Sequence, residues 1–165
     1  MLSEALIGRL NTQVALELFS SNLYLQMAAW CEHKGLPGCS AFLAQHASEE
    51  YQHARKLFTY VTETGGLAQI GSIEAPRAEY AGVQAIFDQT LAHELSITGK
   101  INELVKAAMD EGDFSTFNFL QWYVAEQHEE EKLFRNIVDR IRVIGADGKG
   151  LYWIDKEIGK LAKAA

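Results

Sequence analysis

The segment EEYQH, residues 49–53, places two carboxylates and an imidazole within five positions. Glu50 and His53 are three residues apart, so in a helix both side chains can point into one space, with Glu49 beside them. Carboxylate oxygens with one imidazole suit iron or manganese, and would also hold zinc. The spacing therefore predicts part of a metal site.

A second acidic segment, EQHEEE, lies some distance further along the chain. Its candidate ligands are Glu126, Gln127, Glu129 and Glu130. Glu126 and Glu130 are one helical turn apart, and Gln127 and Glu130 are three residues apart. The alternative is a solvated face, in which Glu129 to Glu131 pair with Lys132 and Arg135.

Two further carboxylates lie at comparable depth in other amphipathic segments. Glu17 is followed seven residues later by Tyr24, on the same helical face, and Glu94 lies within LAHEL. Each residue alone is typical of a surface charge, but one acidic group per segment at matched depth is not. Isolated buried carboxylates are costly, whereas a cluster of them becomes favourable when divalent cations neutralise it.

Four long helices are needed to position these groups. Apolar residues recur at helical spacing over about residues 4–34, 40–64 and 83–110, and again from the EGDFS turn to about Ile144. We expect Asp113 or Ser115 to cap the fourth helix. A short last helix is expected at about 149–163. The two prolines, Pro37 and Pro76, are expected in connections.

The connections predict how the helices are arranged. GLPG is a short turn, which makes an antiparallel pair, whereas about residues 65–82 form a long link that lets the third helix run parallel to the second. The expected fold is an all-α four-helix bundle with one long crossover, occupying residues 1–165 as a single domain.

Composition excludes several other classes of protein. The chain has 165 residues and a net charge of -7, which disfavours binding to a nucleic-acid backbone. There is no apolar run of about 18 residues, and the N-terminus does not resemble a signal peptide, so we expect a cytoplasmic protein without membrane contact. Cys31 and Cys39 are expected to be reduced thiols.

Taken together, these residues resemble the non-haem bacterial ferritins over essentially the whole chain. The segment NFLQWYVAEQHEEEKLF is particularly similar to that family's fourth helix. The resemblance implies a ferritin-like bundle with a short fifth helix, assembled into a hollow shell of about 24 identical subunits. It also implies a ferroxidase that oxidises Fe(II) with O2 and stores iron as a ferric oxyhydroxide mineral.

The resemblance also assigns roles to the candidate residues. Glu17, Glu50 and His53 would form a first iron site, and Glu50 would bridge to a second site completed by Glu94. Gln127 would lie near this second site and Glu130 would contribute to it, while Tyr24 would be an electron donor beside the dinuclear centre. The third site would consist of Glu49, Glu126, Glu129 and Glu130.

Departures from related families inform the remaining expectations. Bacterioferritins carry His where this chain has Glu130, and a haem-ligating Met where it has Tyr51, so no haem is expected. Two alternatives remain open: a small di-iron oxidase or peroxidase without storage, and a non-enzymatic helical module.

Overall fold

The structure is a computed structural model and describes residues 2–162. The helices within this range are α1 (Glu4–His33), α2 (Pro37–Glu63), α3 (Val83–Asp110), α4 (Phe114–Ile144) and α5 (Gly148–Ala162). The all-α fold, four long helices and a short fifth, is confirmed. The expected last residue of the fifth helix, Lys163, lies outside the described residues.

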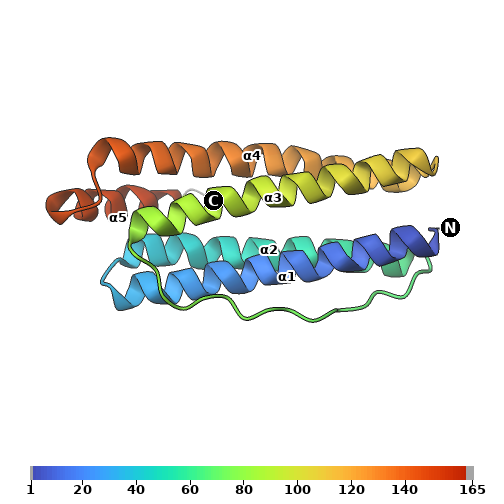
Figure 1. Cartoon of the computed structure of the whole chain (residues 1–165), viewed down its shortest axis with the longest axis horizontal. Helices are drawn as coiled ribbons and strands as arrows, with labels where there is room; N and C mark the ends of the chain where they lie inside the picture. The colour runs from blue at the N-terminus through green and yellow to red at the C-terminus, as the bar shows by residue number, and fades with distance from the viewer. Residues whose placement is uncertain (1, 163–165) are drawn as a thin grey trace.

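The helices form two antiparallel pairs joined by the long crossover (Figure 1). α1 packs against α2, and α3 packs against α4. The crossover, residues 64–82, runs the length of the bundle beside α1, so α2 and α3 point the same way (Figure 1). The expected topology therefore follows from one long and two short connections.

Local sequence sets the helix ends. The Ser3 hydroxyl accepts a hydrogen bond from the Leu6 amide at 3.0 Å, and the Asp113 carboxylate accepts one from the Thr116 amide at 3.0 Å. Both side chains satisfy amides that have no partner inside their helices. Pro37 is the first residue of α2, so its expected place in a connection was wrong. Proline suits a first helical position because its fixed φ is helical and no amide donor is needed there.

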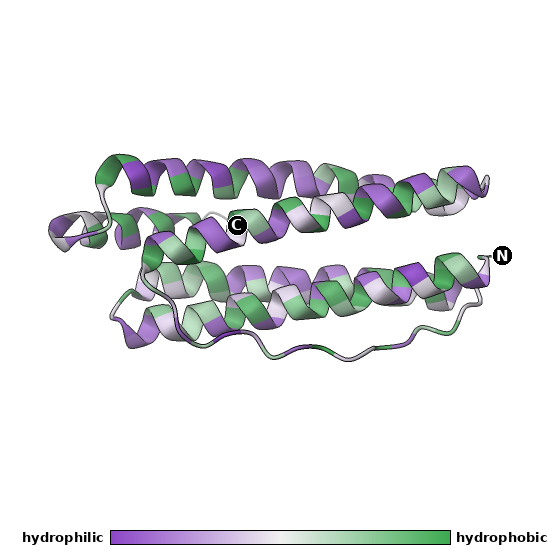
Figure 2. Cartoon of the chain, viewed as in Figure 1, coloured by the Kyte–Doolittle hydropathy of each residue, from purple (hydrophilic) through white to green (hydrophobic). Residues whose placement is uncertain are grey.

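The apolar core is divided into two clusters along the bundle. One includes Tyr24, Phe42 and Phe134 towards the α5 end, and the other includes Leu10 and Leu57 towards the opposite end. In every long helix the acidic candidate residues fall between these two clusters. Figure 2 shows hydrophilic and hydrophobic residues alternating along all four helices. The division of the core creates a polar layer at the centre of the bundle.

α5 packs closely against the start of α2. A Cβ added at Gly38 would lie 2.0 Å from the backbone oxygen of Asp155, and one added at Gly159 would lie 2.8 Å from the Gly38 Cα. The Asp155 carboxylate also accepts a hydrogen bond from the Cys39 amide at 2.8 Å. Glycine is therefore required where these two helices cross.

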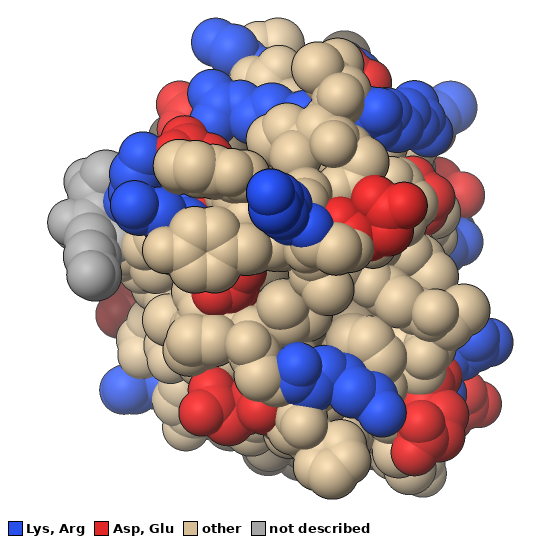
Figure 3. Space-filling view, turned by 90° about the vertical axis from the view of Figure 1, so that its left-hand side faces the viewer, with Lys and Arg blue, Asp and Glu red and all other residues tan. Residues whose placement is uncertain are grey.

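The surface at this end of the bundle carries both signs of charge. Figure 3 shows Lys and Arg side chains interspersed with Asp and Glu. Within residues 2–162, none of the helices combines the length and apolar character needed to cross a bilayer.

Candidate metal centre

Six buried polar side chains meet in the central layer of the bundle. They come from all four long helices: Glu17 of α1, Glu50 and His53 of α2, Glu94 of α3, and Gln127 and Glu130 of α4. Each is less than a tenth exposed. The similar depths of these residues along their helices, which the sequence predicted, correspond to one layer of the bundle.

The first cluster consists of Glu17, Glu50 and His53. One donor atom from each residue lies within 4.8 Å of the other two. His53 Nδ1 is 3.4 Å from Glu50 Oε2, as expected for residues three apart in a helix. The Gln13 amide donates to Glu17 Oε1 at 2.8 Å, and the Tyr123 hydroxyl donates to the His53 backbone oxygen at 2.8 Å. Neighbouring side chains therefore orient the cluster.

Glu94 is held from two sides. The Tyr24 hydroxyl donates a hydrogen bond to Glu94 Oε1. The Gln127 side-chain amide donates to Glu94 Oε2 at 3.0 Å and to the Glu94 backbone oxygen at 3.3 Å. Gln127 thus lies beside the expected second site, where its amide nitrogen orients the carboxylate.

A second cluster joins His46 to Glu49 and Glu130. His46 Nε2 is 3.7 Å from an oxygen of each carboxylate, and the three donor atoms meet within 4.8 Å. Sequence reasoning missed His46, although the spacing of His46 and Glu49 repeats the three-residue interval of Glu50 and His53.

The remaining expected ligands lie at the edge of this layer. Glu126 is partly exposed, and its Oε1 is 3.9 Å from His53 Nε2, so it faces the first cluster. Glu129 is exposed and lines the same cavity as Glu49 and Glu130. The proposed set of four for the third site therefore stays a prediction.

Burial raises the pKa of the central carboxyl groups. Removal from water is the largest cause for Glu17, Glu50 and Glu94, and mutual repulsion between neighbouring carboxylates adds to it for Glu17 and Glu50. For Glu130, burial followed by repulsion from Glu94 raises the pKa to about 9. A divalent cation would reverse these effects, because it favours the charged form of every ligand around it.

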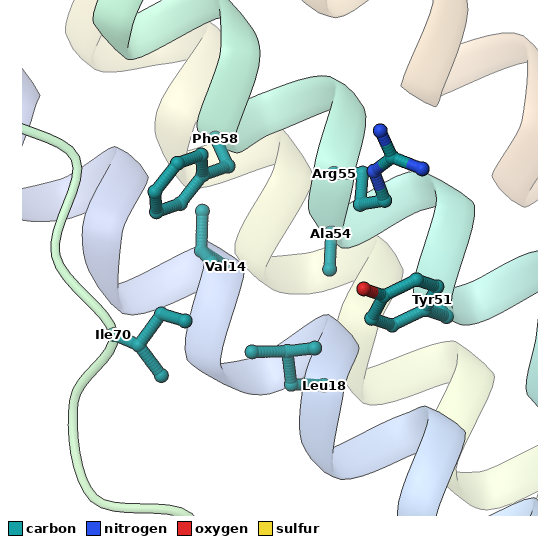
Figure 4. Close-up of a pocket in the computed structure, with 7 residues that line it drawn as sticks. All are labelled: Val14, Leu18, Tyr51, Ala54, Arg55, Phe58 and Ile70. Atoms are coloured by element: carbon teal, nitrogen blue, oxygen red, sulfur yellow. The ribbon is translucent and has the colours of Figure 1, made fainter.

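A separate pocket lies on the outer face of α1 and α2, under the crossover (Figure 4). Its polar members are Tyr51 and Arg55, and the rest of its lining is apolar, including Phe58 and Ile70. This composition suits packing against an apolar surface. The carboxylate and histidine side chains that could bind a metal lie in the central layer instead.

Comparison with known proteins agrees with the observed fold. Residues 7–144 match the family model for the ferritin-like domain. The chain is 56% identical over 165 residues to a probable bacterial non-heme ferritin-like protein of Haemophilus influenzae, covering all of both chains. It is 53% identical over 161 residues to the bacterial non-heme ferritin of Escherichia coli O6:H1, covering 98% of each.

A solved structure gives the same result. The open-pore ferritin of the archaeon Archaeoglobus fulgidus superposes with a TM-score of 0.94 at 42% identity, over 96% of this chain and 98% of that one. A helical bundle with a central carboxylate and histidine layer defines a ferritin-like protein. The chain belongs to the ferritin family, and within it resembles the bacterial non-haem ferritins.

Proposed function

We propose that this protein stores iron: it oxidises Fe(II) with O2 at the bundle centre and deposits ferric oxyhydroxide inside a hollow homo-oligomer. The buried cluster of Glu17, Glu50 and His53 carries the proposal, because its donor atoms converge within 4.8 Å. Within residues 2–162, the only basic side chains that pair with Glu50 and Glu130 are histidines. Such a group of acids needs protons or metal cations.

Two Fe(II) ions would bind as substrate on either side of Glu50. One would be held by Glu17 and His53, and the other by Glu94. Each ion gives up one electron, so that two Fe(II), one O2 and four waters yield two FeOOH, one H2O2 and four protons. The carboxylates favour this direction because they interact more strongly with Fe(III) than with Fe(II).

Side chains around Glu94 affect how the second iron ion would be held. Gln127 offers a neutral amide, a weak ligand, so the second ion should be held loosely enough to move on to the mineral. Tyr24 is hydrogen-bonded to Glu94 and therefore lies where it can supply an electron. Its burial, followed by repulsion from Glu94, raises the pKa of the Tyr24 hydroxyl, which keeps it protonated at neutral pH.

Assembly is the second part of the proposal. The outer pocket presents apolar side chains to solvent, with Tyr51 47%, Phe58 37% and Ile70 61% exposed. Exposed apolar groups that adjoin one another are typical of contacts between protein copies. We propose a closed assembly of about 24 chains. Absence of haem and a cytoplasmic location stay predictions.

Iron oxidation in solution tests the proposal. Metal-free protein mixed with Fe(II) in air should consume O2 rapidly and retain the iron in large particles. Glu50→Ala and His53→Ala should abolish the rapid phase while leaving the assembly intact. Glu103→Ala and His128→Ala are matched controls, because both side chains are exposed.

Three results would contradict the proposal. Oxidation of Fe(II) no faster than in buffer would exclude a ferroxidase. A monomer or dimer by light scattering, with oxidation intact, would favour a small di-iron oxidase without storage. Unchanged iron chemistry in both central variants would favour a helical module that is not an enzyme.

A further inference from the structure

Trp122 is an aromatic side chain beside the metal centre that the proposed reaction does not use. It lies on α4 and is 37% exposed, so small molecules in solvent can reach it. Its ring meets the His53 ring in a T-shaped arrangement, with centroids 5.2 Å apart and an interplanar angle of 78°. The Tyr123 ring is a second T-shaped neighbour, at 4.8 Å. An indole is therefore in contact with a residue of the first cluster.

The side chain of Lys56 lies on the face of this indole. Its Nζ is 3.4 Å from the Trp122 ring centroid, well inside the distance of about 6 Å at which an ammonium and an indole attract each other. Lys56 follows His53 by three residues, so α2 presents the imidazole and the ammonium to the same ring. Partial burial lowers the pKa of Lys56, while the neighbouring Glu126 carboxylate favours its charged form. A positive charge is thus placed on an oxidisable ring.

Tyr24, the aromatic side chain beside Glu94, has the opposite electrostatic surroundings. Its hydroxyl donates a hydrogen bond to Glu94, and the charges of Glu50 and Glu130 also act on it. Carboxylates beside a phenol stabilise the positive charge that develops when the ring loses an electron. An ammonium beside an indole has the reverse effect, because two positive charges repel at short distance. Loss of an electron is therefore favoured at Tyr24 and disfavoured at Trp122.

The proposed reaction supplies an oxidant that makes this difference matter. It releases one H2O2 for every two Fe(II) oxidised, and remaining Fe(II) converts H2O2 into stronger oxidants. Overall, one oxygen atom of H2O2 would be inserted into an indole C–H bond and the other would leave as water. This two-electron oxidation gives hydroxytryptophan, which would change the packing of Trp122 against His53.

We propose that Lys56 protects Trp122 from oxidation: its ammonium makes the indole harder to oxidise, so that the ring survives turnover and Tyr24 supplies any electron beyond those of Fe(II). The inference rests on the proposed function for the source of the oxidant. The effect of the charge on the ring does not depend on iron and is present in the metal-free protein as well.

The azide radical tests the effect of the charge in the metal-free protein. This neutral oxidant, generated by pulse radiolysis, takes one electron from an indole and becomes azide, and the indole radical cation releases its N–H proton to water. Because the oxidant is uncharged, removing a lysine does not alter its approach. Peptide mass spectrometry separates the oxidised products of the three tryptophans. Trp153, which is 51% exposed, is the internal reference for Trp122.

Lys56→Gln should raise the ratio of Trp122 to Trp153 oxidation about 5- to 30-fold, the range expected for the loss of one cation–π contact. Glutamine keeps a long side chain over the ring, so the change tests charge rather than cover. Lys56→Arg keeps the positive charge and should stay close to the native ratio. Lys106→Gln is the matched control: it removes a lysine that is 74% exposed and pairs with Asp110, and it should leave the ratio unchanged.

An unchanged ratio in Lys56→Gln would overturn the proposal. An equal increase in Lys56→Arg or in Lys106→Gln would also overturn it, since the positive charge on the ring would then not be the cause. Lys56 is exposed, so these substitutions leave the core of the bundle intact.

Repeated additions of Fe(II) in air to the assembled protein test protection during turnover. Trp122 should be converted to hydroxytryptophan faster in Lys56→Gln than in the native chain, and equal survival of Trp122 in the two proteins would overturn the protective role. Failure of the proposed function is a separate result. Fe(II) oxidation no faster than in buffer would refute the ferroxidase, whereas the azide measurement would still decide whether Lys56 makes the indole harder to oxidise.

Discussion

Replacing Glu130 by glutamine should stabilise the metal-free protein at high pH. The pKa of Glu130 is raised from an ordinary 4.5 to about 9 in the folded protein, chiefly by burial. Between those values the folded chain keeps a proton that the unfolded chain has lost, so stability falls as pH rises. Glutamine keeps the shape of the side chain, and its amide does not ionise in this pH range.

The size of the effect follows from the pH interval. Between its pKa in the unfolded chain and its pKa in the folded chain, one such group lowers the free energy of unfolding by about 1.4 kcal/mol per pH unit. From pH 5 to pH 8, about three units, the native chain should lose up to about 4 kcal/mol that Glu130→Gln retains. The two proteins should therefore be similarly stable at pH 5, with the variant more stable at pH 8.

Denaturation by guanidinium chloride in the presence of a chelator measures this difference. Protein concentration must be held constant, because the stability of an assembly depends on it. Glu129→Gln is the matched control: it makes the same change one residue away, at an exposed position, and should alter stability by less than about 0.5 kcal/mol at either pH.

The reasoning is refuted if Glu130→Gln changes stability equally at pH 5 and pH 8. Such a result would mean that Glu130 has a similar pKa in the folded and unfolded chain. Lower stability of the variant at pH 8 would also contradict it, since that would require the charged carboxylate to be stabilised by a partner that the amide lacks.

Further substitutions, with comparison variants for two of them, test three individual contacts. Tyr24→Phe removes the hydroxyl bonded to Glu94 and should lower the free energy of unfolding by about 1–2 kcal/mol in the same assay; no change would mean that the hydrogen bond contributes nothing. Gly38→Ala places a Cβ 2.0 Å from a backbone oxygen of α5, so amide hydrogen exchange in α5 should become faster. The comparison variant Gly8→Ala places a Cβ with nothing within 4 Å, and it should stabilise α1 by about 0.5–1 kcal/mol. Asp113→Ala removes the cap of α4 and should cost about 1 kcal/mol by denaturation, with Asp113→Asn retaining most of it.

Helical periodicity made most of the fold readable from the sequence. The lengths of the connections gave the topology, since a short turn permits only antiparallel neighbours and the long crossover permits a parallel one. The predicted start of α2 was wrong because proline breaks a helix when it lies in the helix interior but stabilises a helix when it is the first residue, as Pro37 is here. The approach of Gly38 to α5 joins residues more than a hundred positions apart, and no local pattern indicates it.

The sequence by itself determined which side chains share a helical face and how deep each lies, because both depend only on spacing within one helix. That was enough to bring Glu17, Glu50, His53 and Glu94 into one layer. Tertiary structure decided which atoms face one another across helices. Axial register and rotation between α2 and α4 bring Glu130 to His46 and Glu126 to His53, and those between α3 and α4 turn the amide of Gln127 towards Glu94. Packing of the whole core sets these quantities, so a single helix read alone does not contain them.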